Sequence, residues 1–321
     1  MLTRAEEARV SRGSTVGAAT VLAILWGAPA LFAADQLPLA PYYTLGRGDE
    51  FGSALAVGDG VVAVGAYLSA AGGGAESGAV YVFSREWSAP AQLCGTPGDW
   101  FGFDVAIDAT GKQLLVGAPR AHDGSGAQTG AAYLYQLDAL HPGQPCGPEN
   151  RQVLTLADRA GDEIGSAVAL SGTCWAVGAR SDSSQAAGAG SVYVNCAPGQ
   201  PKLYSPAPAD GAHFGQSVSL DGCSLTPAGC ILAVGAPFAG VGGAAYVFAD
   251  ATGWQPTPLT VAAVPAGAAF GYAVAVSGNQ VVVGAPRLFR HVACGRLGHN
   301  RVLLGVNPIW GVEELKRLDL V

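Results

Sequence analysis

Three short stretches of alternating apolar residues recur in the same order along the chain. In their first occurrence they are Ala54–Val57, Val61–Ala66 and Ala79–Phe83, separated by turns rich in glycine and aspartate. Alternation over four to six positions between such turns is typical of strands in an antiparallel sheet. A further short run, such as Tyr42–Leu45, precedes each set. The pattern therefore predicts units of four short strands.

The unit occurs five times. Each copy has a glycine after an aromatic residue or isoleucine, at positions 52, 102, 165, 215 and 271, so the steps are 50, 63, 50 and 56 residues. A repeat of this length with several strands per unit is the signature of a β-propeller. We therefore expect an all-β protein, a propeller of about five four-stranded blades or an incomplete ring of six or seven.

Three motifs define the repeat: Phe51–Gly52, Val64–Ala66 and Gly78–Phe83 in the first copy. They resemble the FG-GAP repeat, the unit of integrin alpha-chain β-propellers. The resemblance extends from Tyr42 to Pro286. It implies a scaffold used for recognition and does not imply a particular reaction.

The two faces of each predicted blade differ in bulk. In Ala54–Val57 the side chains of Leu55 and Val57 share one face and the alanines share the other, and Ala167–Leu170 follows the same rule. Such faces suit sheets in which the large residues of one blade meet the small residues of the next. A single blade cannot bury both faces, so we expect the repeats to be stable only as an assembly.

The sequence divides into three predicted segments. Residues 1–34, with arginines ahead of the apolar stretch Val16–Ala34, predict a secretory signal peptide or an uncleaved signal anchor. Residues 35–286 form the propeller, and 287–321 are a divergent tail. The repeat cores are residues 49–83, 99–135, 162–194, 211–248 and 267–286.

The tail lacks the Gly-Ala-Val-Tyr motif that should close the last repeat. In one interpretation Val302–Leu304 is a divergent third strand and Gly311–Leu318 a short helix. In the other, the reading frame changes near Arg287 and the native propeller continues further. Both interpretations stay open at this point.

The net charge and the N-terminal segment limit the cellular compartments and the binding partners that we expect. The net charge of −7 disfavours nucleic acid and anionic membranes, which both attract basic patches. No other stretch is apolar enough to span a membrane. The N-terminal segment predicts a secreted or cell-surface protein, with anchoring by the signal segment as the alternative.

Seven cysteines in an exported chain favour disulfides. Each predicted pair brings together the ends of neighbouring strands or the connections around one repeat, and the alternative is a set of buried thiols. No Cys-x-x-Cys occurs, which disfavours a structural metal site. The candidate pairs are Cys223 with Cys230, Cys174 with Cys196, and Cys94 with Cys146, and they leave Cys294 unpaired.

The chain offers little chemistry beyond its scaffold. Calcium needs six or more oxygen ligands, but no loop between the first and second strands holds more than one carboxylate, so we expect no cofactor. Neither Gly-x-Ser-x-Gly nor His-Glu-x-x-His is present. The acidic pairs Asp49–Glu50 and Asp162–Glu163 precede a strand, where turn residues are expected. The sequence favours a binding protein over an enzyme.

We therefore expect a propeller that binds a protein or glycan through the loops at one end. The tryptophans that could contact a ligand, if exposed, are Trp87, Trp100, Trp175 and Trp254. One alternative is an exported hydrolase or lyase with its site in the propeller channel. Another is a truncated gene product without an independent function.

Overall fold

The computed structural model describes most of the repeat region. The described residues are 48–144, 146, 151–154, 156, 159–196, 202–223, 229–259, 264–278 and 280–287, with the backbone of 295–297 and 300–305. The predicted signal segment and the predicted helix at 311–318 lie outside them. Among the described residues, no helix is long and apolar enough to cross a membrane.

The described chain folds into five sheets of four strands, as the repeats predict. However, the short run that precedes each later set is the fourth strand of the sheet before it and not of its own unit, since Ala91–Cys94 pairs with Ala79–Ser84. The first sheet is β1 (Leu55–Gly58), β2 (Val61–Ala66), β3 (Ala79–Ser84) and β4 (Ala91–Cys94). The second is β5 (Asp104–Ile107), β6 (Gln113–Ala118), β7 (Ala131–Gln136) and β8 (Arg151–Val153). The third is β9 (Ile164–Ser171), β10 (Cys174–Ala179), β11 (Ser191–Val194) and β12 (Lys202–Tyr204). The fourth is β13 (Ser217–Asp221), β14 (Ile231–Ala236), β15 (Ala244–Ala249) and β16 (Thr257–Pro258).

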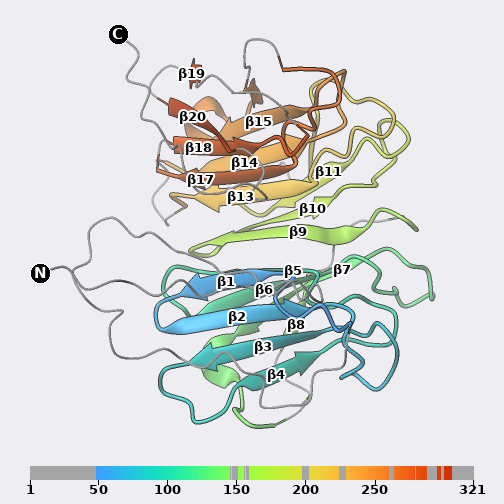
Figure 1. Ribbon diagram of the computed structural model, residues 1–321, viewed down its shortest axis with the longest axis vertical. Helices are drawn as coiled ribbons and strands as arrows, with labels where there is room; N and C mark the ends of the chain where they lie inside the picture. The colour runs from blue at the N-terminus through green and yellow to red at the C-terminus, as the bar shows by residue number, and fades with distance from the viewer. Residues whose placement is uncertain are drawn as a thin grey trace, which may run out of the picture. The chain divides into compact units, whose positions relative to one another are not determined.

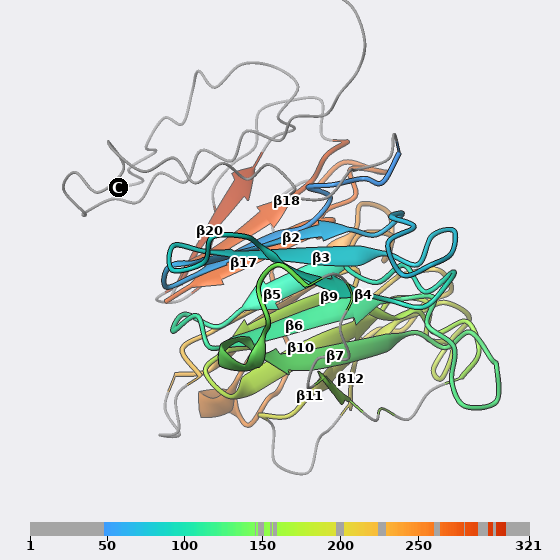
Figure 2. The same cartoon turned by 90° about the horizontal axis from the view of Figure 1, so that it is seen from below.

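These four sheets are antiparallel meanders in which each strand pairs with the next one along the chain. The first strands lie innermost: β5 contacts both β1 and β9, and β13 contacts both β9 and β17. In Figure 1, β9 and β13 lie beside one another, and β3 and β4 lie further out than β1. Seen from below, β5, β6 and β7 follow one another outward (Figure 2). Two single 3-10 turns, Leu137–Ala139 and Asp250–Thr252, follow third strands.

The fifth sheet departs from the meander. Its strands are β17 (Ala273–Ser277), β18 (Gln280–Gly284), β19 (Gly295–Leu297) and β20 (Asn300–Gly305), in the order β17-β18-β20-β19. Val302–Leu304 lies in strand β20, as the first of the two interpretations of the tail expects. However, β20 runs parallel to β18, because the chain forms the outer strand β19 first and then turns back into the third position.

A tight turn begins each repeat and explains its first glycine. In the second repeat Phe103 N donates to Trp100 O at 3.2 Å, and Gly102 between them has φ 84°. A type II turn requires a positive φ at this position, which glycine adopts without strain. The same hydrogen bond and a glycine φ of 84–91° recur in all five repeats.

The second glycine of each repeat sets the distance to the next sheet. A Cβ on Gly117 would lie 2.0 Å from the carbonyl oxygen of Gly165, and one on Gly235 would lie 1.9 Å from that of Gly271. Gly65 and Gly178 face the next repeat in the same way, at 2.2 Å. Two backbones can approach this closely only where neither carries a side chain. The Phe-Gly turn of one repeat therefore packs directly on the Gly-Ala strand of the repeat before it.

Large and small side chains alternate across these junctions, as their unequal faces predict. Ala54 and Ala63 of the first sheet pack with Val105 and Ile107 of the second. The other three junctions form apolar clusters of the same kind, between sheets two and three, three and four, and four and five. Each sheet is thus covered by its neighbours, which explains why one blade alone would be unstable.

The outer faces of the first and last sheets are partly open. Val57 on β1 is 69% exposed and Leu55 is 36% exposed, although equivalent residues of later sheets are covered. On β17, Ala273 and Ala275 are exposed. Among the described residues, a Cβ on Gly284 would meet only Ala273 of its own sheet, at 3.4 Å or more. The described chain thus forms four tight junctions of this kind, and Gly284 does not contribute a fifth.

These two environments allow a matched test of the packing. The substitution Gly235→Ala should lower the free energy of unfolding by about 2–4 kcal/mol, because its Cβ collides with a carbonyl oxygen that cannot move without separating two sheets. Gly284→Ala at the equivalent position should change it by less than about 0.5 kcal/mol. Urea unfolding of both variants measures the difference. Equal losses would contradict the close approach.

Candidate functional site

One end of the sheets is built from two segments of every repeat. The first is the Phe-Gly turn, and the second is the pair of residues that follows Gly-Ala at the end of the second strand. A backbone hydrogen bond joins the two segments in repeats two to five. The donors are Arg120 N to Asp99 O, Ser181 N to Asp162 O, Phe238 N to Ala212 O and Arg287 N to Ala268 O, at 3.2–3.4 Å.

The residue before each Phe-Gly or Ile-Gly pair has a left-handed backbone, and none of the five is a glycine. These residues are Glu50, Trp100, Glu163, His213 and Ala269, with φ between 53° and 57°. A left-handed non-glycine residue costs on the order of 1–3 kcal/mol, and such residues cluster at functional sites. Side chains of four residue types are held at five equivalent strained positions, which marks this end as the candidate functional surface.

An aromatic cluster occupies the first part of this end. Trp100 stacks on Phe103 with ring centroids 5.9 Å apart, and Tyr67 meets both rings edge-on at 5.4 and 5.3 Å. The guanidinium carbon of Arg120 lies 3.6 Å from the centre of the Trp100 ring. Trp100 Nε1 donates to Glu76 Oε2 at 2.8 Å, and Arg120 also contacts Glu76. Tyr67 belongs to the first repeat and the other rings to the second, so the cluster spans a junction.

A second group continues the surface over the third and fourth repeats. The guanidinium of Arg180 lies 5.5 Å from the Phe103 ring and also pairs with Glu163. His213 meets Phe238 edge-on at 5.2 Å, and 41% of Phe238 is exposed. The whole set lies on one end of four successive repeats, and we call it the aromatic–arginine face. It consists of Tyr67, Trp100, Phe103, Arg120, Glu163, Arg180, His213 and Phe238.

Two titratable groups of the face, Glu163 and His213, have shifted pKa values. Burial raises the pKa of Glu163, but hydrogen bonds from Arg180 and Ser181 outweigh it and leave the pKa below its usual value. Burial lowers the pKa of His213, and the nearby Arg180 lowers it further. His213 is therefore neutral and Glu163 ionised at pH 7. The face keeps an ion pair and a neutral imidazole side by side.

Asp104 holds two repeats together directly behind Phe103. Its carboxylate accepts hydrogen bonds from the backbone N–H of Val168, on the next sheet, at 2.7 Å and from that of Val105 at 3.0 Å. Burial raises the pKa of Asp104 to about 6, because these two bonds only partly replace the lost water. The carboxyl group therefore ionises close to neutral pH.

The four tryptophans singled out from the sequence lie in different surroundings. Trp100 is the one on the aromatic–arginine face. Trp254 is only 5% exposed and packs in the cluster between sheets three and four, so it is not a contact residue. Trp87 and Trp175 are half-buried against core clusters, with Trp175 at the start of β10, the end opposite to Arg180. Sequence reasoning missed Tyr67, Phe103 and the arginines, although their places after Gly-Ala and Phe-Gly were a signal.

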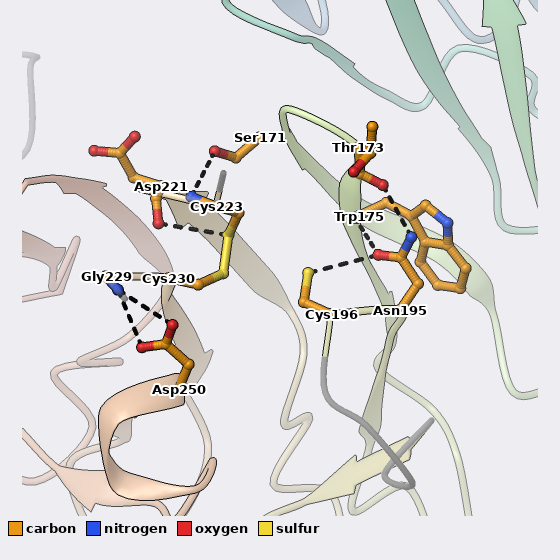
Figure 3. The surroundings of a disulfide bond; sticks show 10 residues. All are labelled: Ser171, Thr173, Trp175, Asn195, Cys196, Asp221, Cys223, Gly229, Cys230 and Asp250. Atoms are coloured by element: carbon orange, nitrogen blue, oxygen red, sulfur yellow. Dashed lines mark hydrogen bonds between the residues drawn. A yellow bond between two sulfur atoms is a disulfide. The ribbon is translucent and has the colours of Figure 1, made fainter. Parts of the chain in front are cut away.

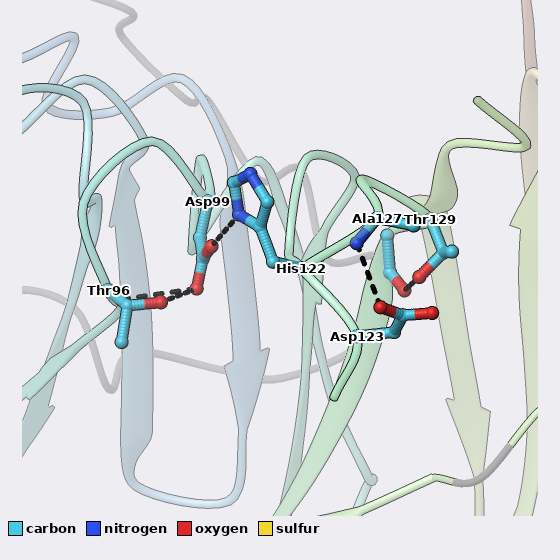
Figure 4. A network of polar contacts seen from close by, with 7 residues as sticks. Thr96, Asp99, His122, Asp123, Ala127 and Thr129 are labelled. Atoms are coloured by element: carbon cyan, nitrogen blue, oxygen red, sulfur yellow. Dashed lines mark hydrogen bonds and ion pairs between the residues drawn. The ribbon is translucent and has the colours of Figure 1, made fainter. Parts of the chain in front are cut away.

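The acidic turn residues act as hydrogen-bond acceptors in the turns. Asp99 is 4% exposed, accepts from the N–H and hydroxyl of Thr96, and lies 3.3 Å from Nδ1 of His122 (Figure 4). Asp123, in the following loop, accepts the N–H of Ala127 at 2.9 Å (Figure 4). The His122–Asp99 pair lies in connecting loops and not on the innermost strands. In the described part of the chain, His122 has no further side-chain hydrogen bond.

The carboxylate in the loop of the second repeat is likewise engaged. Asp108 accepts from Thr110, from Lys112 N at 2.8 Å and from Gln113 N at 2.6 Å. Burial raises its pKa, but these bonds outweigh burial and lower it overall. The carboxylate therefore closes its own turn, and a cation would have to displace these bonds.

Two cysteine pairs form disulfides, and the two cysteines of a third predicted pair lie close to the second disulfide. Cys94 is bonded to Cys146 and Cys223 to Cys230, with Cα separations of 5.1 and 4.3 Å. Cys174 and Cys196 are thiols. Cys294 lies outside the described residues.

The raised pKa of Asp104 predicts a pH-dependent stability. Folding favours the uncharged carboxyl, so Asp104 costs stability as the pH rises through about 6. Asp104→Asn removes the charge but keeps only one of the two acceptor oxygens that Val105 N and Val168 N use. The variant should still have a higher free energy of unfolding than the wild type at pH 8, by less than the about 3 kcal/mol that corresponds to the pKa shift. This advantage should be lost near pH 4, where the carboxyl group of Asp104 is protonated.

Asp108→Asn is the matched control, because the pKa of Asp108 is lowered and its charge stabilises the fold. This variant should melt lower than the wild type at pH 8. Thermal melts of the three proteins between pH 4 and pH 8 test both signs. An Asp104→Asn variant that is less stable at pH 8 would contradict a buried, poorly compensated carboxylate.

Comparison with known proteins supports the repeat assignment. No curated protein matched the chain. A chain of the structure described as "Crystal Structure of Mitotic Checkpoint Complex" is 14% identical, with a TM-score of 0.44 over 81% of this chain and 68% of that one. The family model "FG-GAP repeat" matches residues 46–83, 95–135 and 150–195. The first three repeats thus match FG-GAP repeats. The fourth and fifth repeats have the same Phe-Gly turn and Gly-Ala strand, and the five four-stranded sheets form an all-β, blade-type architecture.

Proposed function

We propose that the protein is a secreted or cell-surface recognition module that binds a protein or glycan through the aromatic–arginine face. The observation that carries the proposal is the set of five strained, non-glycine residues at one end of the repeats. Glycine would relieve the strain at each of them, and yet four of the five positions carry a tryptophan, a histidine or a glutamate. A role for these side chains outside the fold accounts for this.

The chemistry of the face suits recognition. Tryptophan, tyrosine and arginine are the residues that contribute most often to binding energy at interfaces. Flat aromatic rings offer rigid apolar area, and Arg120 and Arg180 offer several hydrogen-bond donors each. Both arginines contact glutamates, so the face is not strongly basic. This balance fits a neutral or mixed-charge protein or glycan better than a polyanion.

The alternative of a hydrolase or lyase lacks a comparable observation. The His122–Asp99 pair belongs to loops, and its buried aspartate also serves the turn through Thr96. The aromatic–arginine face contains Glu163, but Arg180 lowers the pKa of that carboxylate and makes it a poor proton donor. We therefore propose a non-enzymatic function.

Binding can be tested with the tagged chain on a glycan array and on a panel of cell-surface proteins. Trp100→Ala and Arg180→Ala should each weaken a detected interaction about tenfold or more, the loss expected for residues at the centre of an interface. Trp175→Ala, at the other end of β10, is the matched control and should bind like the wild type. Thermal melts verify that the variants are folded.

Equal binding by wild type, Trp100→Ala and Arg180→Ala would remove the face from the proposal. A loss caused by Trp175→Ala alone would place the ligand at the opposite end of the repeats. Turnover of a glycan by the wild type would favour the enzymatic alternative.

A further inference from the structure

Four cysteines from two neighbouring sheets meet at the end of the repeats opposite to the aromatic–arginine face. Cys174 begins β10 and Cys196 follows β11, both in the third sheet. Cys223 follows β13 and Cys230 precedes β14, both in the fourth. Their four sulfur atoms all lie within 4.8 Å of one another. Figure 3 shows the Cys223–Cys230 bond with Cys196 on the neighbouring strand end.

The strand register places Cys174 opposite Cys196. Ala176 pairs with Val194 in the β10–β11 ladder, so the same register brings residue 174 opposite residue 196. Asn195 N donates to Trp175 O at 3.3 Å, and Trp175 N donates to the side-chain Oδ1 of Asn195 at 2.6 Å, so residues 175 and 195 lie opposite each other at a hydrogen-bonded position of the ladder. In an antiparallel ladder the next pair is then non-hydrogen-bonded, with Cα atoms about 4.5 Å apart. This separation is within the range of disulfides.

The two pairs differ in their surroundings. Cys223 and Cys230 are each 6% exposed and pack in the apolar cluster between the sheets. Cys174 and Cys196 are partly buried and pack against the same cluster from the third sheet. Ser171 Oγ accepts the N–H of Cys223 at 3.3 Å, so a hydrogen bond also joins the two strand ends (Figure 3). A dithiol thus lies against a disulfide across a packed junction.

We propose that these four cysteines form one thiol–disulfide exchange centre between the third and fourth sheets. The thiolate of Cys174 or Cys196 attacks one sulfur of the Cys223–Cys230 bond. That bond breaks, the other sulfur leaves as a thiolate and takes up a proton, and a disulfide now joins the two sheets. The remaining thiol of the first pair, once deprotonated, attacks this mixed disulfide. The products are a Cys174–Cys196 disulfide and the two thiols of Cys223 and Cys230.

The exchange conserves atoms and electrons without an external oxidant, since two electrons pass from one dithiol to the other pair. Its rate depends on the fraction of attacking thiolate. Burial raises the pKa of Cys196, and the neighbouring Cys174 raises it further. Exchange should therefore be slow at pH 7 and faster at pH 9.

A four-thiolate zinc site is the competing use of the same atoms. Zinc–sulfur bonds of about 2.3 Å place tetrahedral ligands about 3.8 Å apart, within the span of the cluster. However, each pair sits at the two ends of one hairpin, where a disulfide forms most easily, and Cys223 is bonded to Cys230 in the structure. The observations therefore favour exchange.

Trypsin separates the two possibilities by mass. Cleavage after Arg159, Arg180, Lys202 and Arg287 places Cys174 in peptide 160–180, Cys196 in 181–202, and Cys223 with Cys230 in 203–287. The full chain is treated with one equivalent of dithiothreitol at pH 7 or 9, quenched with acid, alkylated and digested. We expect cross-linked peptides that join 203–287 to 160–180 or 181–202, several-fold more at pH 9 after a fixed short time.

Cys196→Ser should accumulate the cross-link from Cys174, because the resolving thiol is missing. Cys94→Ser with Cys146→Ser, which removes the distant pair, should leave the exchange unchanged. The wild-type measurement stands without any variant. Cys223–Cys230 bonds alone at both pH values, with neither a cross-linked peptide nor a Cys174–Cys196 bond, would overturn the proposal. So would one equivalent of zinc in the purified protein with all four thiols free on denaturation.

Discussion

The structure depends on a contact between two glycine backbones at each junction of successive sheets. The glycine of one Gly-Ala strand lies against the carbonyl of the next Phe-Gly turn, at a separation that leaves no room for a Cβ. This contact brings neighbouring sheets close enough for alanines on one face to fill the spaces between valines and isoleucines on the other. It also aligns the Phe-Gly turns, so every repeat presents its variable residues at the same end.

Where two sheets pack closely, some backbone N–H groups have no strand partner, and polar side chains accept their hydrogen bonds. The innermost strand of each sheet is an edge strand, and its backbone N–H groups face the sheet before it. Asp104 accepts from Val168, Ser219 from Val276 and Asp221 from Gly278, each across a junction, at 2.6–3.0 Å. These acceptors occupy positions where other repeats have small residues. The junctions are thus joined by apolar packing and by a few side-chain bonds to the backbone.

The sequence predicted the fold well because each strand and turn of the fold has its own local sequence pattern. Alternating residues mark the strands, and a glycine in each turn and each second strand marks the repeat. The candidate face was harder to predict, because Tyr67 and Trp100 meet only when two repeats are stacked, and because Trp254 looks like Trp100 until its burial is known. The parallel direction of β20 follows from the path of the tail, which no strand pattern records. The four cysteines were assigned as separate pairs, and only the packing of sheets brings them together.

The backbone of each Phe-Gly turn and the side chain at the left-handed position before it are determined by different residues. The turn glycine and the junction glycine hold the backbone in place, so the side chain at the strained position can be exchanged without rebuilding the fold. Selection for heat resistance alone would replace these residues by glycine and erase the surface that they present. A library that varies only positions 50, 100, 163 and 213 would therefore explore new specificities on an unchanged framework.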